Sequence, residues 1–219
     1  MRNILKNQQG FTIIELTLSM AMLSVLMIII ILSAMNITGT YNKGITLKRV
    51  NQSGRAISTE LQSDLRRSAI GDGVTKVVNI GYRERIIDGQ TYRTGVCIGK
   101  NSYIWSLYLD GGGVVEEKFT NDQTISMIKI SDPGMCVKDP DYKVPNKSNS
   151  SILLGDDLVV RQPTDVQWGD SSGIIRFTFT ISTSDSDVGV ITADDACVGG
   201  KEKSFCALNT FEVTAYANL

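Results

Sequence analysis

The 219-residue sequence contains no histidine. This absence excludes nucleophilic sites that pair serine or cysteine with histidine, and it removes the commonest acid–base group of enzymes. Zinc is disfavoured as well, because the four cysteines include no Cys-x-x-Cys pair and no histidine can complete a site. We therefore expect a chain without catalytic activity, without a metal and without a cofactor.

Paired acids are the remaining candidates for acid–base chemistry. They occur as Asp156-Asp157 and Asp194-Asp195. Neighbouring side chains of a strand point to opposite faces, so adjacent acids make poor acid–base couples, and we interpret them as solvated loop charges. Asp185-Ser186-Asp187 offers oxygen ligands suited to calcium, but the spacing does not follow an EF-hand pattern.

A surplus of positive charge is also missing. The chain has 22 basic and 23 acidic residues, a formal net charge of −1, which is not the electrostatic footprint of a nucleic-acid binder. In one short region, around residues 82–93, basic and aromatic side chains occur together and could bind single-stranded DNA: Arg83, Arg85, Arg93, Tyr82 and Tyr92. The alternative, which we favour, is the polar face of an antiparallel sheet in which acids alternate with these cations.

Charge is almost absent from one long segment. Phe11 to Met35 spans 25 residues with Glu15 as its one formal charge and with no proline or glycine. As an α-helix this segment would be roughly 37 Å long, enough to cross a hydrocarbon core of about 30 Å. Residues 1–10 carry Arg2 and Lys6 and no acid, which favours a cytoplasmic N-terminus and export of the remainder.

Glu15 requires an explanation, because a carboxylate within lipid costs about 2–3 kcal/mol at the membrane centre and less near the interface. One interpretation is an interfacial acid just before the span; the other is a device for assembly. An ordinary secretory signal is a competing interpretation of the whole segment, and Ser33-Ala34-Met35 weakly imitates its cleavage site. Its apolar region is normally only about 7–15 residues long, which argues against it here.

The residues around this acid, Gly10-Phe11-Thr12-Ile13-Ile14-Glu15, resemble the processing site of type IV prepilins and type II secretion pseudopilins. The resemblance implies that a prepilin peptidase cuts after Gly10, that Phe11 becomes the N-methylated mature N-terminus, and that Glu15 acts in assembly. The new amine of Phe11 and the Glu15 carboxylate would then favour each other in a low dielectric, either within one helix or between subunits.

The same resemblance implies partners and a location. Besides the peptidase, the expected partners are other pilin subunits in a helical filament, the pilus assembly platform, and membrane lipid before assembly. The expected location is the cytoplasmic membrane, as a single-pass protein with its head outside the cytoplasm, and then the pilus on the cell surface.

Beyond the apolar run the helical pattern weakens and then resumes. Gly39 and Gly44 each cost a helix roughly 1 kcal/mol relative to alanine, so we expect a softened section over residues 36–44. From residue 45 an apolar stripe recurs at helical spacing, which predicts a face packed on a domain: Val50, Gly54, Ile57, Leu61 and Leu65. The opposite side is expected to carry Lys48, Arg55, Glu60, Asp64 and Arg67.

The end of this second helical part resembles that of minor pilins of the PilW kind and of the J-type pseudopilin. The residues that carry this likeness are Arg55-Ala56 and Leu61-Gln62-Ser63-Asp64-Leu65-Arg66-Arg67. The match is short and is dominated by charge, and it favours a minor subunit.

After residue 73 the pattern becomes extended, with Asp88-Gly89 as a hairpin signal. The predicted fold class is α+β: a long N-terminal helix, transmembrane in its first half, packed on an antiparallel β-sheet head, as in pilins. The predicted parts are a leader (1–10), a transmembrane helix (11–38), an amphipathic helix (45–70) and a head (74–219). The expected strands cover 74–80, 82–87, 91–98, 103–109, 114–119, 125–130, 152–161, 174–181 and 210–217, with an exposed loop at 139–151.

The four cysteines, Cys97, Cys136, Cys197 and Cys206, all follow the apolar segment. An even number in an exported domain favours two disulfides, and four cysteines allow three pairings. We favour Cys197–Cys206, which closes a short loop and resembles the C-terminal disulfide loop of many pilins, and this leaves Cys97–Cys136.

The sequence therefore predicts a structural subunit, a minor pilin in preference to a major one. The alternatives are a pseudopilin of a secretion pseudopilus and a pilus-tip subunit for adhesion or DNA uptake.

Overall fold

The structure is a computed structural model. It describes residues 11–68, 80–109, 113–136, 143–145, 150–155, 157–168, 174–183, 190–191, 197–198 and 206–216. The chain forms two compact units, one ending at Asn42 and one beginning at Lys43. The expected leader, residues 74–79 of the strand predicted at 74–80, and residues 139–142 and 146–149 of the loop predicted at 139–151 lie outside the described residues.

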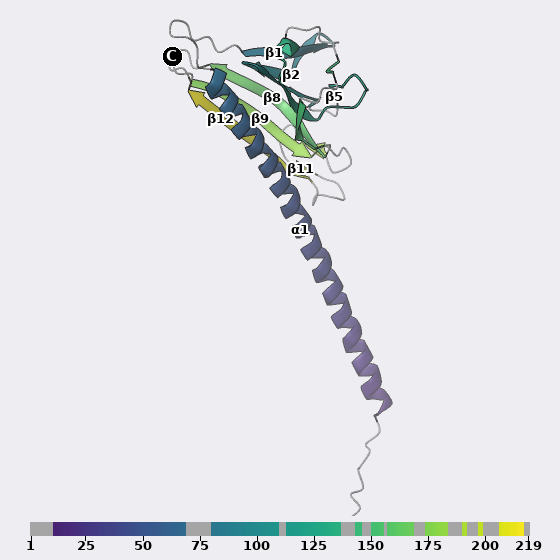
Figure 1. The fold of residues 1–219 in the computed structure, drawn as a ribbon. Coiled ribbons are helices and arrows are strands. Elements are labelled where there is room, and N and C mark those ends of the chain that lie inside the picture. The colour runs from purple at the N-terminus through teal and green to yellow at the C-terminus, as the bar shows by residue number, and fades with distance from the viewer. Residues whose placement is uncertain are drawn as a thin grey trace, which may run out of the picture. The chain divides into compact units, whose positions relative to one another are not determined.

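One long helix, α1 (Ile13–Ser68), contains both predicted helical parts (Figure 1). The softened section expected over residues 36–44 is wrong, because these residues are helical throughout. Two isolated glycines cost only about 1 kcal/mol each, and helix formation is cooperative, so they do not interrupt a helix of 56 residues. Thr38 and Thr40 also donate their hydroxyls to the carbonyls of Ala34 and Asn36, at 2.9 and 3.0 Å.

The second unit contains two five-stranded sheets. The first sheet, in the order β1-β2-β3-β6-β7, is antiparallel throughout, and the second, in the order β12-β9-β8-β4-β5, has one parallel pair, β4 with β8. The strands of the first sheet are β1 (Ile80–Ile87), β2 (Gln90–Ile98), β3 (Asn101–Trp105), β6 (Met127–Ile130) and β7 (Ser150–Leu154). Those of the second sheet are β4 (Leu107–Tyr108), β5 (Val114–Val115), β8 (Leu158–Trp168), β9 (Ile174–Thr183) and β12 (Leu208–Tyr216). A separate pair consists of β10 (Val190–Ile191) and β11 (Cys197–Val198), and η1 (Pro133–Cys136) is a 3₁₀ turn.

Two predicted strands are each divided between the sheets. The run at 103–109 breaks at Ser106, with β3 in the first sheet and β4 in the second. The run at 152–161 breaks at a turn in which the Leu158 amide donates to the Gly155 carbonyl at 3.1 Å. Both runs are apolar on either side of the break, so the sequence pattern did not reveal the change of sheet.

The predicted hairpin at Asp88-Gly89 is confirmed. It joins β1 to β2 in antiparallel register, with Ile87 opposite Gln90. Both turn residues have positive φ, 51° for Asp88 and 79° for Gly89, as a two-residue turn of type I′ requires.

The second half of α1 packs on the second sheet through the predicted stripe. Val50, Ile57 and Leu61 are completely buried, in one core with Phe177 and Phe179 of β9. Figure 1 shows this part of α1 running along β9 and β12. Polar contacts join the same elements, since the Gln62 side chain donates to the Thr214 carbonyl at 3.1 Å.

Candidate functional site

The start of α1 is closed by a capping box formed by Thr12 and Glu15. The backbone amide and the hydroxyl of Thr12 donate to one Glu15 carboxylate oxygen, at 3.0 and 2.9 Å. In return the Glu15 amide donates to the Thr12 hydroxyl at 3.4 Å, and the Leu16 amide donates to the Thr12 carbonyl at 3.2 Å. Reciprocal bonds of this kind satisfy amides that the first turn of a helix leaves unpaired. The charge role predicted for Glu15 did not include this cap, although Thr-x-x-Glu before an apolar run is its known signal.

The predicted cleavage position immediately precedes this cap. Phe11 lies outside the helix and is 79% exposed, and Gly10 lies outside the described residues. The predicted pairing of a Phe11 amine with Glu15 concerns the cut chain and stays a prediction. In the uncut chain the Glu15 carboxylate is engaged by Thr12.

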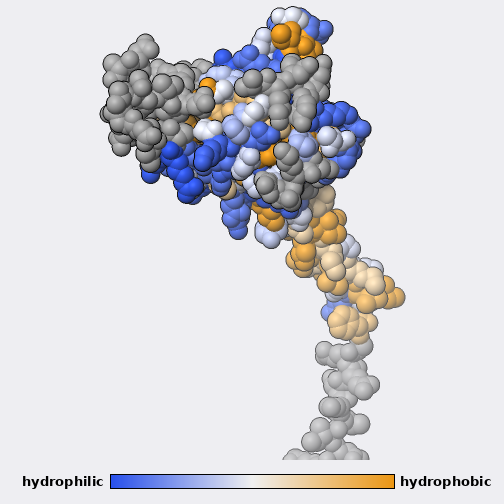
Figure 2. Space-filling view, turned by 45° about the horizontal axis from the view of Figure 1, so that its top comes forward, coloured by the Kyte–Doolittle hydropathy of each residue, from blue (hydrophilic) through white to orange (hydrophobic). Residues whose placement is uncertain are grey.

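The surface of the helix beyond the cap is apolar and uncovered. Ile13 to Met35 includes a long series of exposed large apolar side chains, and none of the most apolar stretch of the helix is buried. Figure 2 shows apolar colours predominating on the helix, whereas the described surface of the head is mainly hydrophilic. By length and composition α1 is able to cross a membrane. Such a surface requires lipid or other apolar helices around it.

The polar face predicted for the second half of α1 is wrong at Asp64. Its side chain is buried, and it accepts hydrogen bonds from the Asn101 amide and the Tyr103 hydroxyl, both at 2.7 Å. Lys129 of β6 lies 2.8 Å from the same carboxylate and 2.6 Å from Glu60 one turn earlier. These residues therefore join α1 to the first sheet. Helical spacing alone missed the cluster, because Asp64 lies beside the apolar stripe and its partners are distant in sequence.

Asp64 is ionised in this setting. Burial alone would raise the pKa of its carboxyl, but the hydrogen bonds from Lys129, Tyr103 and Asn101 outweigh it and lower that pKa. Burial and the Asp64 carboxylate both raise the pKa of Tyr103, so its phenol stays protonated and donates. The salt bridge between Asp64 and Lys129 therefore has a buried carboxylate that is also hydrogen-bonded to Asn101 and Tyr103.

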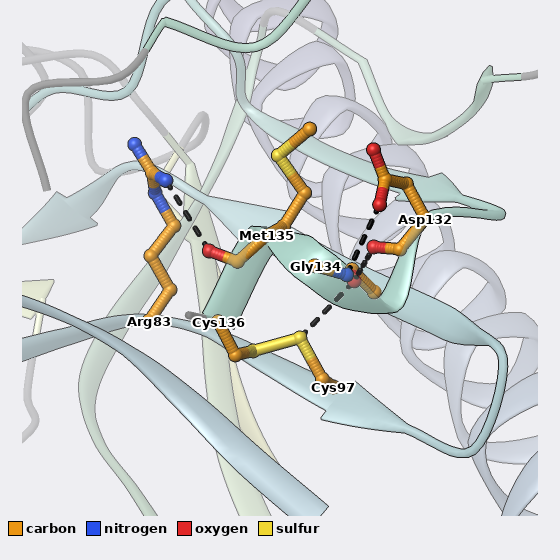
Figure 3. The surroundings of a disulfide bond; sticks show 7 residues. Arg83, Cys97, Asp132, Gly134, Met135 and Cys136 are labelled. Carbon is orange, nitrogen blue, oxygen red and sulfur yellow. Dashed lines mark hydrogen bonds between the residues drawn. A yellow bond between two sulfur atoms is a disulfide. The ribbon is translucent and has the colours of Figure 1, made fainter. Parts of the chain in front are cut away.

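A disulfide joins Cys97 of β2 to Cys136 of η1, with a Cα–Cα distance of 6.1 Å (Figure 3). This is one of the two favoured pairings. The Cys97 sulfur also lies 3.1 Å from the Ser102 hydroxyl, which donates to the Asp132 carbonyl. Cys206 is disulfide-bonded too, but the Cys197 side chain lies outside the described part of the chain, so the pairing Cys197–Cys206 stays a prediction.

The arginines proposed as a grip for single-stranded DNA are engaged within the protein. Arg83 is buried and lies 2.9 Å from Glu117, and Arg85 lies 3.9 Å from the same carboxylate. Arg93 stacks on the Tyr82 ring at 4.4 Å and lies 3.5 Å from Glu84. These contacts favour the alternative interpretation, the internally neutralised face of a sheet.

The paired acids give no catalytic centre among the described residues. Asp157 forms an exposed salt bridge of 2.7 Å with Arg49 of α1. Asp156, Asp194 and Asp195, and the calcium candidate at 185–187, lie outside the described residues. Within the described part of the chain, no group of three or more His, Cys, Asp or Glu side chains could hold a metal ion.

Comparison with known proteins gives one finding, at the N-terminus. Residues 5–31 match the family model described as the prokaryotic N-terminal methylation motif. The matched segment contains the capping box and most of the apolar run, and it supports placing the chain with type IV pilins and pseudopilins. No curated protein and no solved structure matches the chain.

Proposed function

We propose that this chain is a structural subunit of a type IV pilus, cut by prepilin peptidase after Gly10, methylated on the new N-terminus Phe11, and assembled into a filament through α1. The match of residues 5–31 to the methylation motif carries this proposal. The long uncovered apolar surface of α1 supports it, because that surface suits lipid before assembly and neighbouring helices afterwards. The head then lies outside the cytoplasm, in line with the basic leader.

Processing is tested by sequencing the N-terminus of the protein isolated from its own host. The expected mature chain begins with N-methylated Phe11. A Gly10→Leu variant should stay uncut, because a bulky residue replaces the glycine at the scissile bond. A wild-type protein that begins at Met1, or well beyond Met35, would contradict the proposal.

The two roles of Glu15, cap and charge, are separable by substitution. Glutamine retains the capping box but removes the charge, whereas valine removes both. If assembly depends on a charge pair with the Phe11 amine, Glu15→Gln and Glu15→Val should both be cut and both fail to form filaments. Normal filaments from Glu15→Gln would show that the cap suffices and that the charge-pairing argument is wrong.

We place the chain among minor pilins because of its large head and the PilW-like end of its helix. Mass analysis of purified filaments tests this assignment, since a minor subunit should be scarce in them. The second candidate is a pseudopilin of a type II secretion pseudopilus, and the J-type likeness of the same helix end favours it. Deletion should then abolish secretion of folded proteins while surface pili remain.

A further inference from the structure

A cleft lies in the head where the chain passes from the first sheet to the second. Its volume is about 330 Å³, at the lower end of the range for small-molecule pockets. Residues of β4, β5 and β8 and of the segment before β6 line it: Ser106, Tyr108, Val114, Glu116, Gln123, Thr124, Ile125, Ser126 and Val159. The cleft is remote in sequence from the methylation motif, and the proposed function makes no use of it.

The cleft has a rigid frame. Ser106 donates its amide to the carbonyls of Ile125 and Ser126, at 3.2 and 3.3 Å, and its hydroxyl accepts from the Glu117 amide at 2.9 Å. The Ile125 amide donates to the Glu117 carbonyl at 2.8 Å, and Lys118 and Thr124 form a β-bridge. The two lining segments therefore hold each other in place, and the cleft exists before any ligand arrives.

The rim offers neutral polar groups. The side chains of Gln123, Thr124 and Ser126 make no hydrogen bond to any other residue that the structure describes. An amide and two hydroxyls supply both donors and acceptors at the cleft. Gln123 and Thr124 are exposed and Ser126 is half-buried, so all three are accessible to a ligand that carries several hydroxyl groups.

Charge at the rim is balanced. Glu116 is the one charged residue among the described residues of the lining, and its carboxylate lies 2.9 Å from the Lys118 ammonium. The second oxygen of that carboxylate stays able to accept a hydrogen bond. None of the described lining residues is a cation, and the one acid among them is paired with Lys118, so the cleft suits an uncharged ligand better than a phosphate or a nucleic acid.

An aromatic ring completes the lining. The Arg161 guanidinium lies 4.3 Å from the centre of the Tyr108 ring and is itself held by the Ser182 hydroxyl at 2.8 Å. This stacking fixes the ring. Next to it, Val114, Ile125 and Val159 provide apolar surface. A sugar has the matching combination, since its C–H groups pack on apolar and aromatic surface while its hydroxyls bind polar side chains.

We propose that this cleft binds a neutral hexose, one or two rings in length. Tyr108 and the side chains of Val114 and Val159 contact the C–H face of the sugar, and Gln123, Thr124, Ser126 and the second oxygen of Glu116 bind its hydroxyls. The head is then a carbohydrate-binding module as well as a structural part, whether or not the chain is a pilus subunit.

The test uses the full chain in a detergent without a sugar headgroup. The probes are the methyl glycosides of glucose, galactose, mannose and N-acetylglucosamine at up to about 20 mM, a concentration high enough to detect dissociation constants of about 1 mM. Binding is followed by saturation-transfer NMR and by titration. At least one glycoside should bind, and Gln123→Ala and Glu116→Ala should each weaken it about five-fold, the effect of losing one hydrogen bond.

Gln52→Ala is the matched control, because it removes an exposed amide from α1, away from the cleft lining. It should leave binding unchanged. Tyr108→Phe keeps the ring and should retain most of the affinity, and near-ultraviolet circular dichroism verifies that each variant is folded. The proposal is overturned if no glycoside binds, if the two cleft variants bind as well as the control, or if inorganic phosphate or a single-stranded oligonucleotide displaces the sugar.

Discussion

Replacement of Gly54 by alanine tests how closely α1 approaches the second sheet. A Cβ atom at Gly54 would lie 2.0 Å from Cζ of Phe211 and 2.2 and 2.5 Å from its two ε carbons. Non-bonded carbons settle at about 3.5–4.0 Å, so the ring would have to move by about 1.5 Å. The ring is not free to do so without loss, because it stacks on Phe179 with a centroid distance of 5.5 Å.

Two opposing effects determine how much Gly54→Ala changes the free energy of unfolding. Overpacking typically costs about 1–3 kcal/mol, whereas alanine in place of glycine favours a helix by about 0.5–1 kcal/mol. The expected net loss is about 1–2 kcal/mol, equivalent to a fall of about 3–6 °C in melting temperature for a domain of this size. The assay is thermal unfolding of the full chain in detergent, followed by near-ultraviolet circular dichroism.

The same helix supplies the control. A Cβ atom at Gly44 meets no atom within 4 Å, so Gly44→Ala causes no overpacking. Only the higher helix propensity of alanine remains, and the variant should raise the melting temperature. The double variant Gly54→Ala, Phe211→Leu should lose less than the sum of the two single changes, because the smaller side chain makes room for the new methyl group. An equal rise in melting temperature for Gly54→Ala and Gly44→Ala would refute the close packing of α1 on β12.

Three further predictions concern other contacts. The pKa of the Asp64 carboxyl is lowered in the folded state, so the carboxylate stabilises the fold above its unfolded pKa of about 3.9, and this stabilisation is lost as the pH falls through the folded pKa. The Asp64→Asn variant should therefore lose less stability below about pH 5 than the wild type does in acid-unfolding curves. Thr12→Ala should weaken the first turn of α1 by about 1 kcal/mol and speed amide exchange there, whereas Thr12→Ser should not. Replacing Cys97 and Cys136 together by serine should cost about 4 kcal/mol in denaturant unfolding, the chain-entropy value for a loop of this length, and an unchanged midpoint would contradict that account.

Local signals predicted much of this protein. The apolar run predicted the first half of α1, and the stripe from Val50 to Leu65 predicted the buried face of the second half. Asp88-Gly89 predicted its hairpin, because few residue pairs accept positive φ at both positions. These predictions succeeded because each depends on periodicity or backbone preference within a few residues.

Predictions failed where a local preference had to compete with packing. The glycines at 39 and 44 did not interrupt the helix, since cooperativity outweighs two isolated costs. Asp64 was assigned to the polar face, but Lys129 and Tyr103, distant in sequence, make its burial favourable. The cleft beside Tyr108 was not predicted at all, because its lining comes from four separate segments.

The sequence by itself determined the N-terminal part, namely the motif Gly10 to Glu15 and the apolar helix after it, and it determined the Asp88-Gly89 hairpin of the head. Each of these features depends on residues that are close together in the sequence, so the sequence alone is enough to predict it. Only the tertiary structure decided which sheet each half of a divided strand joins, which acid lies buried against α1, and which side chains surround the cleft. Those outcomes depend on contacts between residues far apart in the chain, and the free energy of such contacts becomes available only once the whole head has packed.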